Sequence, residues 1–235
     1  MQDKKPPIKR PTKKYQPKGL EIIYEDRDLL IVNKSNGLLT VGTDREKDKT
    51  AYALLNNYIQ KGNPRSKNRV FIVHRLDRDT SGVLVFTKNE YAKRYLQENW
   101  PSFDKIYFAV VHGKLNEKEG LITSYLLENK AHRMYSVNDP GKGKLSKTGY
   151  KVVKESKKFS LLEINLLTGR KNQIRVHLSE KGNPVVGDKM YGKTDKGIKR
   201  LALHAASITI LHPFTKKKMV FESVAPVYFK TIMKL

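Results

Sequence analysis

Cysteine is absent from this chain of 235 residues. Its absence excludes disulfide bonds, thiolate metal sites and a cysteine nucleophile, and it fits the reducing cytoplasm, which is the expected location. Apolar runs are too short to cross a bilayer, and the N-terminal segment lacks the apolar core of a secretory signal. The phosphate loops GxxxxGK[ST] and GxGxxG do not occur, and the six histidines show no HExxH spacing. The sequence therefore predicts neither a metal site nor a nucleotide loop.

Acidic residues are scarce. The chain has 23 Asp and Glu against 47 Lys and Arg, which gives a net charge of +24. A charge of this size predicts a polyanionic partner, because each neutralised phosphate releases counterions. A merely soluble basic surface is the weaker alternative, and binding to a membrane surface is not expected because no long basic amphipathic helix is visible.

The basic residues are dense in residues 1–19, which hold seven of them and a single acid. This segment is expected to be a flexible tail that lies on RNA or DNA, with a solvated leader as the alternative. Residues 20–235 are expected to form one folded domain. Thr50 and Asn89 are predicted to cap helices, and another helix is expected after Pro226.

Strand-like runs outnumber the helical ones, and they follow one another without strict β-α-β alternation. This order predicts an α+β fold with a large, mostly antiparallel mixed sheet, flanking helices and loops, and a central cleft. Residues 138–149, rich in glycine and lysine, are interpreted as a connection between strands. The runs interpreted as strands include LEIIYE, LLIVNK, FIVH, VLVFT, KIYFAVVHG and FSLLEINLLT.

The stretch VHRLDRDTSG places charged residues directly before the apolar run VLVFT. Asp77 and Asp79 are candidates for a nucleophile, a base or a metal ligand. Arg75 and Arg78 could hold such a carboxylate in its ionised form. A salt-bridged structural turn is the alternative, and for an isolated Asp-rich turn it is the better interpretation.

Three further residues are candidates on their surroundings. Arg175 is the charge closest to the buried stripe of a short helix, so a partner carboxylate is expected. Tyr107 lies in a strand that is apolar on both faces. It is expected to be either a core residue or an aromatic ring at the edge of a pocket on which a ligand can stack. His204 is expected to be a hydrogen-bonded core residue rather than a ligand.

The stretch HRLDRDTSGVLVFTK resembles the signature of the RluA-type pseudouridine synthases, which convert selected uridines of ribosomal or transfer RNA to pseudouridine. Four more blocks resemble those of the family in the same order, and together they cover the chain from about residue 20 to its C-terminus. They are YEDRDLLIVNKSNGL, DKIYFAVVHG, TGRKNQIRVHL with GNPVVGDKMYG, and LALHAASITILHP.

The resemblance implies a role for five residues. Asp77 would be the catalytic aspartate and Tyr107 would stack on the flipped uracil. Arg175 would pair with Asp77, Leu203 would line the pocket, and Arg75 would help to hold the base out of its stack. Asp77 would either attack C1′ or promote a glycal route by abstracting a proton. The family needs no cofactor, and the expected partner is RNA, with no DNA or membrane, bound by a monomer.

Two departures from the family pattern stand out. Ser35 takes the place of a usual proline, and Lys171 and Asn172 replace a frequent Thr-His pair. No role is carried over to these positions. Some relatives have an additional N-terminal RNA-binding domain, whereas here a basic tail precedes the expected catalytic domain.

Two other functions remain as alternatives. A non-catalytic RNA-binding or ribosome-assembly protein with this fold would share the basic charge but would not need Asp77. A metal-dependent nuclease would use Asp77, Asp79 and Asp188, and its activity would be sensitive to chelators. The joint presence of Asp77, Tyr107 and Arg175 favours the isomerase.

Overall fold

The computed structural model describes residues 16–42, 46–61, 63, 65–192 and 197–234. Most of the expected basic tail, residues 1–15, therefore lies outside the described residues. None of the helices in the described part is both long and apolar enough to cross a membrane.

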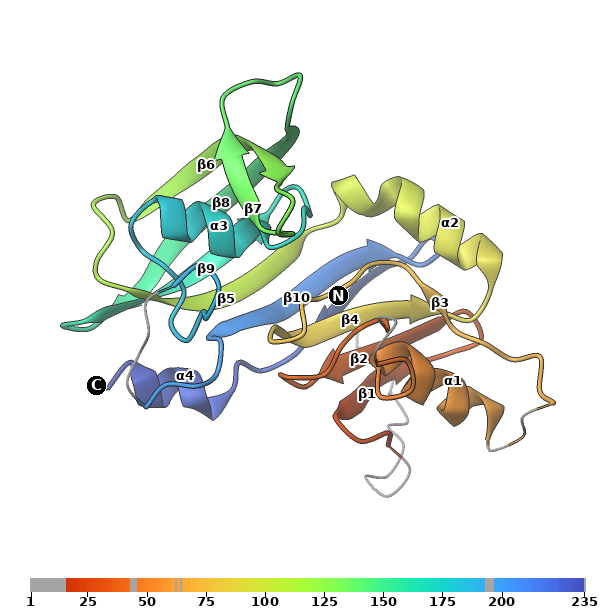
Figure 1. The fold of residues 1–235 in the computed structure, drawn as a ribbon. Helices are drawn as coiled ribbons and strands as arrows, with labels where there is room; N and C mark the ends of the chain where they lie inside the picture. The colour runs from red at the N-terminus through yellow and green to blue at the C-terminus, as the bar shows by residue number, and fades with distance from the viewer. Residues whose placement is uncertain (1–15, 43–45, 62, 64, 193–196, 235) are drawn as a thin grey trace, which may run out of the picture.

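A sheet of 11 strands runs across the molecule (Figure 1). Its main path has the order β1-β2-β4-β10-β5-β9-β8-β6-β7, while β11 pairs with β10 and β3 with β4. The strands are β1 (Leu20–Glu25), β2 (Leu29–Lys34), β3 (Phe71–Ile72), β4 (Ser81–Thr87), β5 (Lys105–His112), β6 (Glu119–Glu128), β7 (Met134–Val137), β8 (Lys144–Glu155), β9 (Phe159–Leu166), β10 (Leu203–Leu211) and β11 (Lys218–Glu222).

The helices are short and lie at the faces of this sheet. They are α1 (Ala51–Gln60), α2 (Glu90–Asn99), α3 (Gln173–Glu180) and α4 (Val227–Ile232), and a 3₁₀ turn spans Trp100–Ser102. The predicted caps are confirmed, because the side chain of Thr50 accepts from the amide of Ala53 at 3.2 Å and that of Asn89 from the amide of Ala92 at 2.8 Å. The helix after Pro226 is confirmed as α4.

Alternation along β4 explains why helices cover both faces of the sheet. Leu84 and Phe86 belong to the same buried cluster as Leu55 of α1. The residues between them face the other way, where Val85 shares a cluster with Leu96 of α2. Every residue of β4 is buried as a result, which fits its place near the middle of the sheet.

One pairing in this sheet is parallel. Ser81 and Gly82 at the start of β4 pair with His204 and Ala205 of β10, whereas the other pairings of the described strands are antiparallel. Gly82 has φ of +117°, and a Cβ there would lie 2.1 Å from the carbonyl oxygen of Ala205. Only glycine allows this close approach of the two backbones. The predicted α+β fold with a mostly antiparallel mixed sheet is confirmed.

Two local predictions were wrong. Residues 138–149 are not all a connection, because β8 already begins at Lys144 and pairs with β6 over its first eight residues. Cross-strand hydrogen bonding outweighs the low strand propensity of its lysines and glycine. The run FIVH forms a strand only at Phe71–Ile72, since the chain then turns away toward the loop that carries Asp77.

Candidate active site

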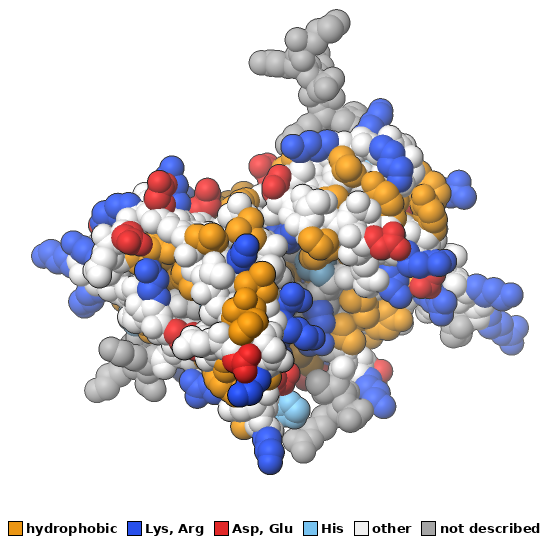
Figure 2. All heavy atoms as spheres, turned by 90° about the horizontal axis from the view of Figure 1, so that it is seen from above, with side chains coloured by type: hydrophobic (Ala, Val, Ile, Leu, Met, Phe, Trp, Pro, Cys, Tyr) orange, Lys and Arg blue, Asp and Glu red, His pale blue; other side chains and the backbone are white. Residues whose placement is uncertain are grey.

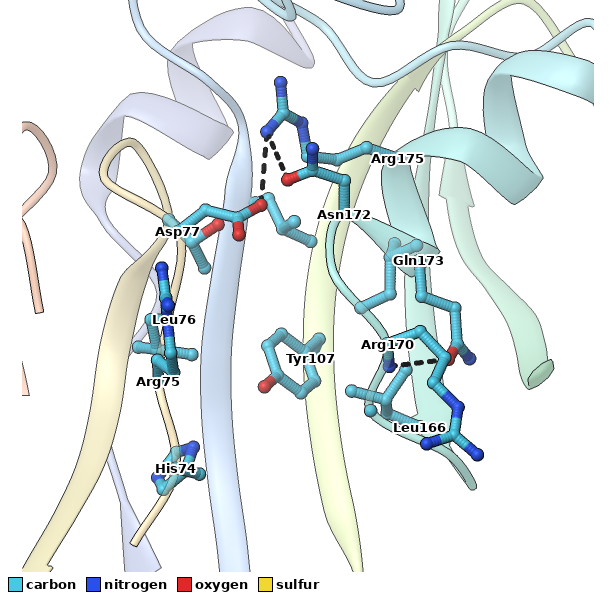
Figure 3. Close-up of a pocket in the computed structure, with 14 residues that line it drawn as sticks. His74, Arg75, Leu76, Asp77, Tyr107, Leu166, Arg170, Asn172, Gln173 and Arg175 are labelled. Atoms are coloured by element: carbon cyan, nitrogen blue, oxygen red, sulfur yellow. Dashed lines mark hydrogen bonds and ion pairs between the residues drawn. The ribbon is translucent and has the colours of Figure 1, made fainter. Parts of the chain in front are cut away.

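A pocket opens where the N-terminal ends of β4 and β10 meet β5 and the segment before α3. All five residues that the family resemblance singles out line it. Figure 3 shows Tyr107 in the middle of the view, between the segment of Arg75 and Asp77 on one side and Leu166 on the other. The lining comprises His74, Arg75, Leu76, Asp77, Thr80, Tyr107, Leu166, Gly169, Arg170, Asn172, Gln173, Ile174, Arg175 and Leu203.

Asp77 lies in a loop that the segment after β2 holds in place. The hydroxyl of Thr40, itself buried, donates to the carbonyl oxygen of Leu76 at 2.8 Å and accepts from the amide of Leu76 at 3.2 Å. The amide of Gly37 donates to the carbonyl oxygen of Arg78 at 2.9 Å. Both neighbours of Asp77 are thereby fixed, which orients its carboxylate toward the pocket.

Lys34 is fully buried beneath the same loop. Its ammonium donates to the carbonyl oxygens of Ser35, Leu38 and Arg78 at 3.0, 2.8 and 3.0 Å. Burial lowers the pKa of Lys34 to about 7, although the carboxylates of Asp79 and Asp77 act to raise it. Lys34 thus joins the end of β2 to the loop of Asp77, a link that the sequence alone did not predict.

Arg175 of α3 pairs with two carboxylates. Its Nε and one terminal nitrogen donate to Asp188 at 2.7 and 2.8 Å. The other terminal nitrogen donates to Asp77 at 3.1 Å and to the side-chain oxygen of Asn172 at 3.1 Å (Figure 3). Burial acts to lower the pKa of Arg175, but Asp188 and then Asp77 raise it above its ordinary value, so the guanidinium stays charged.

Asp188 lies at the bottom of this arrangement and is fully buried, since its side chain is 0% exposed. It also accepts from the amides of Met190 and Tyr191 at 2.9 and 3.0 Å. Burial acts to raise the pKa of Asp188, but the hydrogen bonds and charge of Arg175 and the two amides hold it below its ordinary value. The sequence pointed to Asp188 only as a possible nuclease ligand, because its spacing of 13 residues from Arg175 is not a helical or strand pattern.

The expected pairing of Asp77 with Arg75 or Arg78 does not occur. Arg78 forms an ion pair with Glu46 at 3.1 Å, and the ion pair of Asp77 is with Arg175. Arg78 lies at the exposed side of the turn, where its side chain is 54% accessible. Residues two or one apart in a turn point in different directions, whereas α3 brings Arg175 to the carboxylate from across the pocket.

A metal centre built from Asp77, Asp79 and Asp188 is not supported. Both oxygens of Asp188 are bound by Arg175. Among the described residues, the acidic and histidine side chains close enough to share an ion are Asp26, Asp28 and His212, which precede β2 or follow β10 at the far end of the sheet. The metal-dependent nuclease therefore loses its structural basis.

Tyr107 and Leu203 come from neighbouring strands. Tyr107 of β5 pairs with Ala205, and Leu203 at the start of β10 pairs with Ala109. The tyrosine is 9% exposed, and burial, together with the nearby carboxylate of Asp77, raises its pKa above its ordinary value. Its hydroxyl therefore stays protonated, and the ring forms a neutral apolar surface below Asp77 in Figure 3.

His74 lines the same pocket but is engaged elsewhere. Its Nε2 accepts from the amide of Val85 at 3.1 Å, and its ring lies 4.3 Å from that of Trp100 between centroids. Burial, together with the nearby charge of Lys105, lowers the pKa of His74 to about 3. The imidazole is therefore neutral at physiological pH, with its proton on Nδ1. His204 likewise bonds to Ser81 at 2.9 Å and to the carbonyl of Ser223 at 3.1 Å, as a core residue would.

A second cavity of about 610 Å³ adjoins the pocket and shares Arg75, Leu76, Asp77, Asn172 and Arg175 with it. Its other basic lining residues are Arg78, Arg133, Lys171 and Lys189. Figure 2 shows Lys and Arg side chains spread over the face drawn, with a group of them in a hollow near its middle. Positive charge in a concave site concentrates anionic ligands such as phosphates.

The positions that depart from the family pattern have specific contacts. The amide of Ser35 donates to the carbonyl of Gly19 at 2.9 Å, a bond that proline could not make. Lys171 binds Glu128 at 2.6 Å and the carbonyl of His132 at 3.0 Å. Asn172 has φ of +53°, a conformation that asparagine tolerates better than most residues. Lys171 thus anchors the β6–β7 hairpin beside the pocket.

Comparison with known proteins agrees with this geometry. A family model described as RNA pseudouridylate synthase matches residues 28–180. An uncharacterized RNA pseudouridine synthase of Bacillus subtilis is 36% identical over 219 residues, covering 92% of this chain and 72% of that protein. Ribosomal large subunit pseudouridine synthase C of Vibrio vulnificus is 35% identical, over 84% of this chain and 63% of that protein.

Solved structures lead to the same fold. The human RNA pseudouridylate synthase domain containing 1 protein superposes with a TM-score of 0.72 at 28% identity, covering 88% of this chain and 84% of that one. The human RNA pseudouridylate synthase domain containing 4 protein also superposes with a TM-score of 0.72. Its sequence is 21% identical, and the match covers 89% of this chain and 90% of that one. The chain therefore belongs to the RluA-type RNA pseudouridine synthases and is an isomerase of that family.

Proposed function

We propose that this protein isomerises selected uridines of large-subunit ribosomal RNA, with Asp77 as the catalytic carboxylate. The observation that carries the proposal is that Asp77 is the one carboxylate among the described residues lining the pocket. Arg175 binds one of its oxygens, while the side chain keeps 30% of its surface exposed toward the pocket. A group that is both oriented and accessible is what attack at a sugar carbon or proton abstraction requires.

The reaction conserves every atom of the uridine. The bond from N1 to C1′ breaks, the base rotates, and a bond from C5 to C1′ forms, while C5 loses a proton and N1 gains one. No oxidant, reductant or group donor takes part. Asp77 acts at the sugar in one of two ways. It bonds to C1′ as the bond to N1 breaks and leaves again when C5 bonds to C1′, or it removes a proton from C2′ and returns that proton when the bond to C5 forms. Arg175 holds one oxygen of the carboxylate in place.

The target base has to leave its stack to reach Asp77. Extrusion costs a few kcal/mol, and stacking on an aromatic ring returns about 1–3 kcal/mol. Tyr107 supplies that ring, Leu203 closes the pocket beside it, and Arg75 at the exposed rim takes the place of the stacking partners that the base leaves. The basic cavity next to the pocket binds the flanking phosphates.

The choice of substrate rests on the relatives. Two kinds of curated relative are named for the ribosomal large subunit, pseudouridine synthases C and D. We expect residues 20–235 to act as one monomeric catalytic domain in the cytoplasm. A pseudouridine map of total RNA with and without the protein tests the substrate: signals that disappear from large-subunit RNA support it, and signals that disappear from transfer RNA alone contradict it.

The decisive test of the chemistry compares the two aspartates of the loop. Asp77→Asn keeps the size of the side chain but removes the nucleophile, so turnover of uridine should fall to background while folding and RNA affinity persist. Asp79→Asn should retain measurable turnover, because asparagine replaces aspartate well in turns. Conversion of uridine in an RNA pool is the assay, and circular dichroism confirms folding. A folded Asp77→Asn protein that converts uridine at a comparable rate would refute the role of Asp77.

A further inference from the structure

Two aromatic rings lie exposed at the end of the sheet opposite the pocket. Tyr91 is 52% exposed and Phe214 is 53% exposed, and their ring centroids are 4.9 Å apart at an interplanar angle of 44°. Tyr91 is in the first turn of α2, four residues after the end of β4, and Phe214 is three residues after the end of β10. Because β4 and β10 are parallel, both rings project from the same edge.

Both rings stand on ordered elements. Tyr91 lies in the first turn of α2, which the side chain of Asn89 caps. The turn of Phe214 is organised by the buried ring of His212, whose Nδ1 accepts from the amides of Phe214 and Thr215 at 3.3 and 3.2 Å. An amide can only donate, so Nε2 carries the proton and donates to Asp26 at 3.0 Å. A surface whose rings are held in this way loses little conformational entropy when it binds a flat ligand.

The charge around the two rings is positive. Three consecutive exposed lysines, 216–218, lie in the turn after β10 and at the start of β11. The ammonium of Lys216 lies 3.6 Å from the ring centroid of Tyr95. The nearest exposed acid on α2, Glu90, is paired with Lys93 at 3.3 Å. Asp26 keeps its charge but is partly buried, and it accepts hydrogen bonds from Tyr24 and His212. The excess of positive charge therefore remains available to an anionic ligand.

The positive charge continues around the same end of the sheet. A cavity of about 690 Å³ there has four basic lining residues and one acidic one. Lys88, which lines it, directly precedes the Asn89 cap of α2 and so connects the cavity to the exposed rings. The basic members of the lining are Arg27, Lys61, Arg69 and Lys88.

We propose that Tyr91 and Phe214 form a second RNA-binding surface, on which an unpaired base of the substrate stacks while the lysines of the turn hold its phosphates. Exposed aromatic rings beside basic side chains are the combination that binds single-stranded nucleic acid. β10 runs from Leu203 to Leu211, which is eight residue steps, or about 26–27 Å at the rise of a strand. An RNA bound at both places is thereby held in a defined register relative to Asp77. This inference rests on the proposed function only in taking RNA as the ligand.

The test measures binding without turnover. Fluorescence anisotropy reports the affinity of the full chain for single-stranded RNA of about 20 nucleotides and of about 4 nucleotides, lengths that bracket the separation of the two places. The double variant Tyr91→Ala/Phe214→Ala should bind the long RNA about tenfold more weakly or worse and the short RNA equally well. The matched control is Leu121→Ala/Val153→Ala, which removes apolar side chains of similar exposure, 57% and 53%, from β6 and β8 and should change neither affinity.

A second pair of variants separates stacking from apolar docking. Tyr91→Phe/Phe214→Tyr should bind the long RNA like the unmodified protein, whereas Tyr91→Leu/Phe214→Leu should be as weak as the alanine variant. Unchanged affinity in the alanine variant, or full affinity in the leucine variant, would overturn the proposal. The same affinities are measured again with Asp77→Asn added to each variant, so that no turnover takes place. The result for the two rings then holds even if the catalytic role of Asp77 is wrong.

Discussion

Tyr107 presents a protonated, nearly buried ring to the pocket. Tyr107→Ala removes the whole ring, so kcat/KM should fall by about 5- to 150-fold, the equivalent of one stacked base at about 1–3 kcal/mol. Tyr107→Phe keeps the ring and should retain most of that activity. The measurement is steady-state kinetics on one RNA substrate. A phenylalanine variant as inactive as the alanine variant would assign a chemical role to the hydroxyl.

Asp188 controls the direction in which Arg175 points. Asp188→Asn leaves the buried guanidinium without its main charge partner, and breaking such a pair should reduce the free energy of unfolding by about 3–5 kcal/mol. Replacing both residues, as in Asp188→Asn/Arg175→Met, should restore much of that stability but not the turnover, because Asp77 then lacks its cation. Denaturant unfolding and uridine conversion report the two effects separately. Equal stability of the single and double variants would contradict this account.

His74 makes stability depend on pH. Its folded pKa of about 3 lies below the ordinary value of 6.5, so near pH 5 the unfolded chain binds a proton that the folded protein excludes. The stability contributed by the neutral ring is present above about pH 6.5 and is lost as the pH falls, by about 1.4 kcal/mol per pH unit. In His74→Gln, the slope of unfolding free energy against pH between 4.5 and 6 should fall by up to this amount. An unchanged slope would show that the ring is already protonated in the folded state.

At the scale of elements, the buried ammonium of Lys34 joins β2 to the loop of Asp77. Lys34→Met fills the space but leaves the carbonyls of Ser35, Leu38 and Arg78 without their donor. Unfolding free energy should fall by about 1–3 kcal/mol, and kcat should fall more than KM changes, because the loop no longer fixes Asp77. Lys118→Met removes an exposed lysine paired with Glu155 of β8, and it should leave kcat unchanged. Equal kcat in both variants would contradict the positioning role.

The sequence predicts those elements whose determinants are local. Thr50 and Asn89 cap helices through bonds to residues three positions away, and the period of two in the apolar runs is enough to indicate strands. The pairing of β4 with β10 joins residues more than a hundred positions apart, and no local pattern encodes it. For the same reason Lys34 and Thr40 were missed: their partners Arg78 and Leu76 are close in space but lie 44 and 36 positions away in the sequence. Asp77, Arg75, Tyr107 and Arg175 were candidates from their surroundings in the sequence, but their specific roles came from the family resemblance, which already contains the fold. Leu203 was identified through that resemblance alone.

At the scale of the whole molecule, charge sets the affinity for RNA. Deleting residues 1–18 removes seven basic residues and one acidic one, so binding should weaken and its salt dependence should flatten. The slope of the logarithm of RNA affinity against the logarithm of salt concentration should change by up to about 0.7 for each phosphate of single-stranded RNA that the protein no longer neutralises. The measurement is RNA affinity over a series of salt concentrations, with catalytic turnover at saturating RNA as the control. An unchanged slope would show that the tail does not bind RNA.

The parallel junction of β4 and β10 has a consequence for how the protein matures. Asp77 precedes β4, Tyr107 lies on β5, Arg175 on α3, and Leu203 opens β10, so the pocket is complete only after β10 has been synthesised. Long-range strand pairing of this kind slows folding, and until β10 arrives, the apolar strand β4 has an unpaired edge that invites aggregation. A nascent chain whose β10 is still inside the ribosome therefore lacks a complete pocket and is exposed to aggregation at the same time, and the arrival of β10 ends both conditions together.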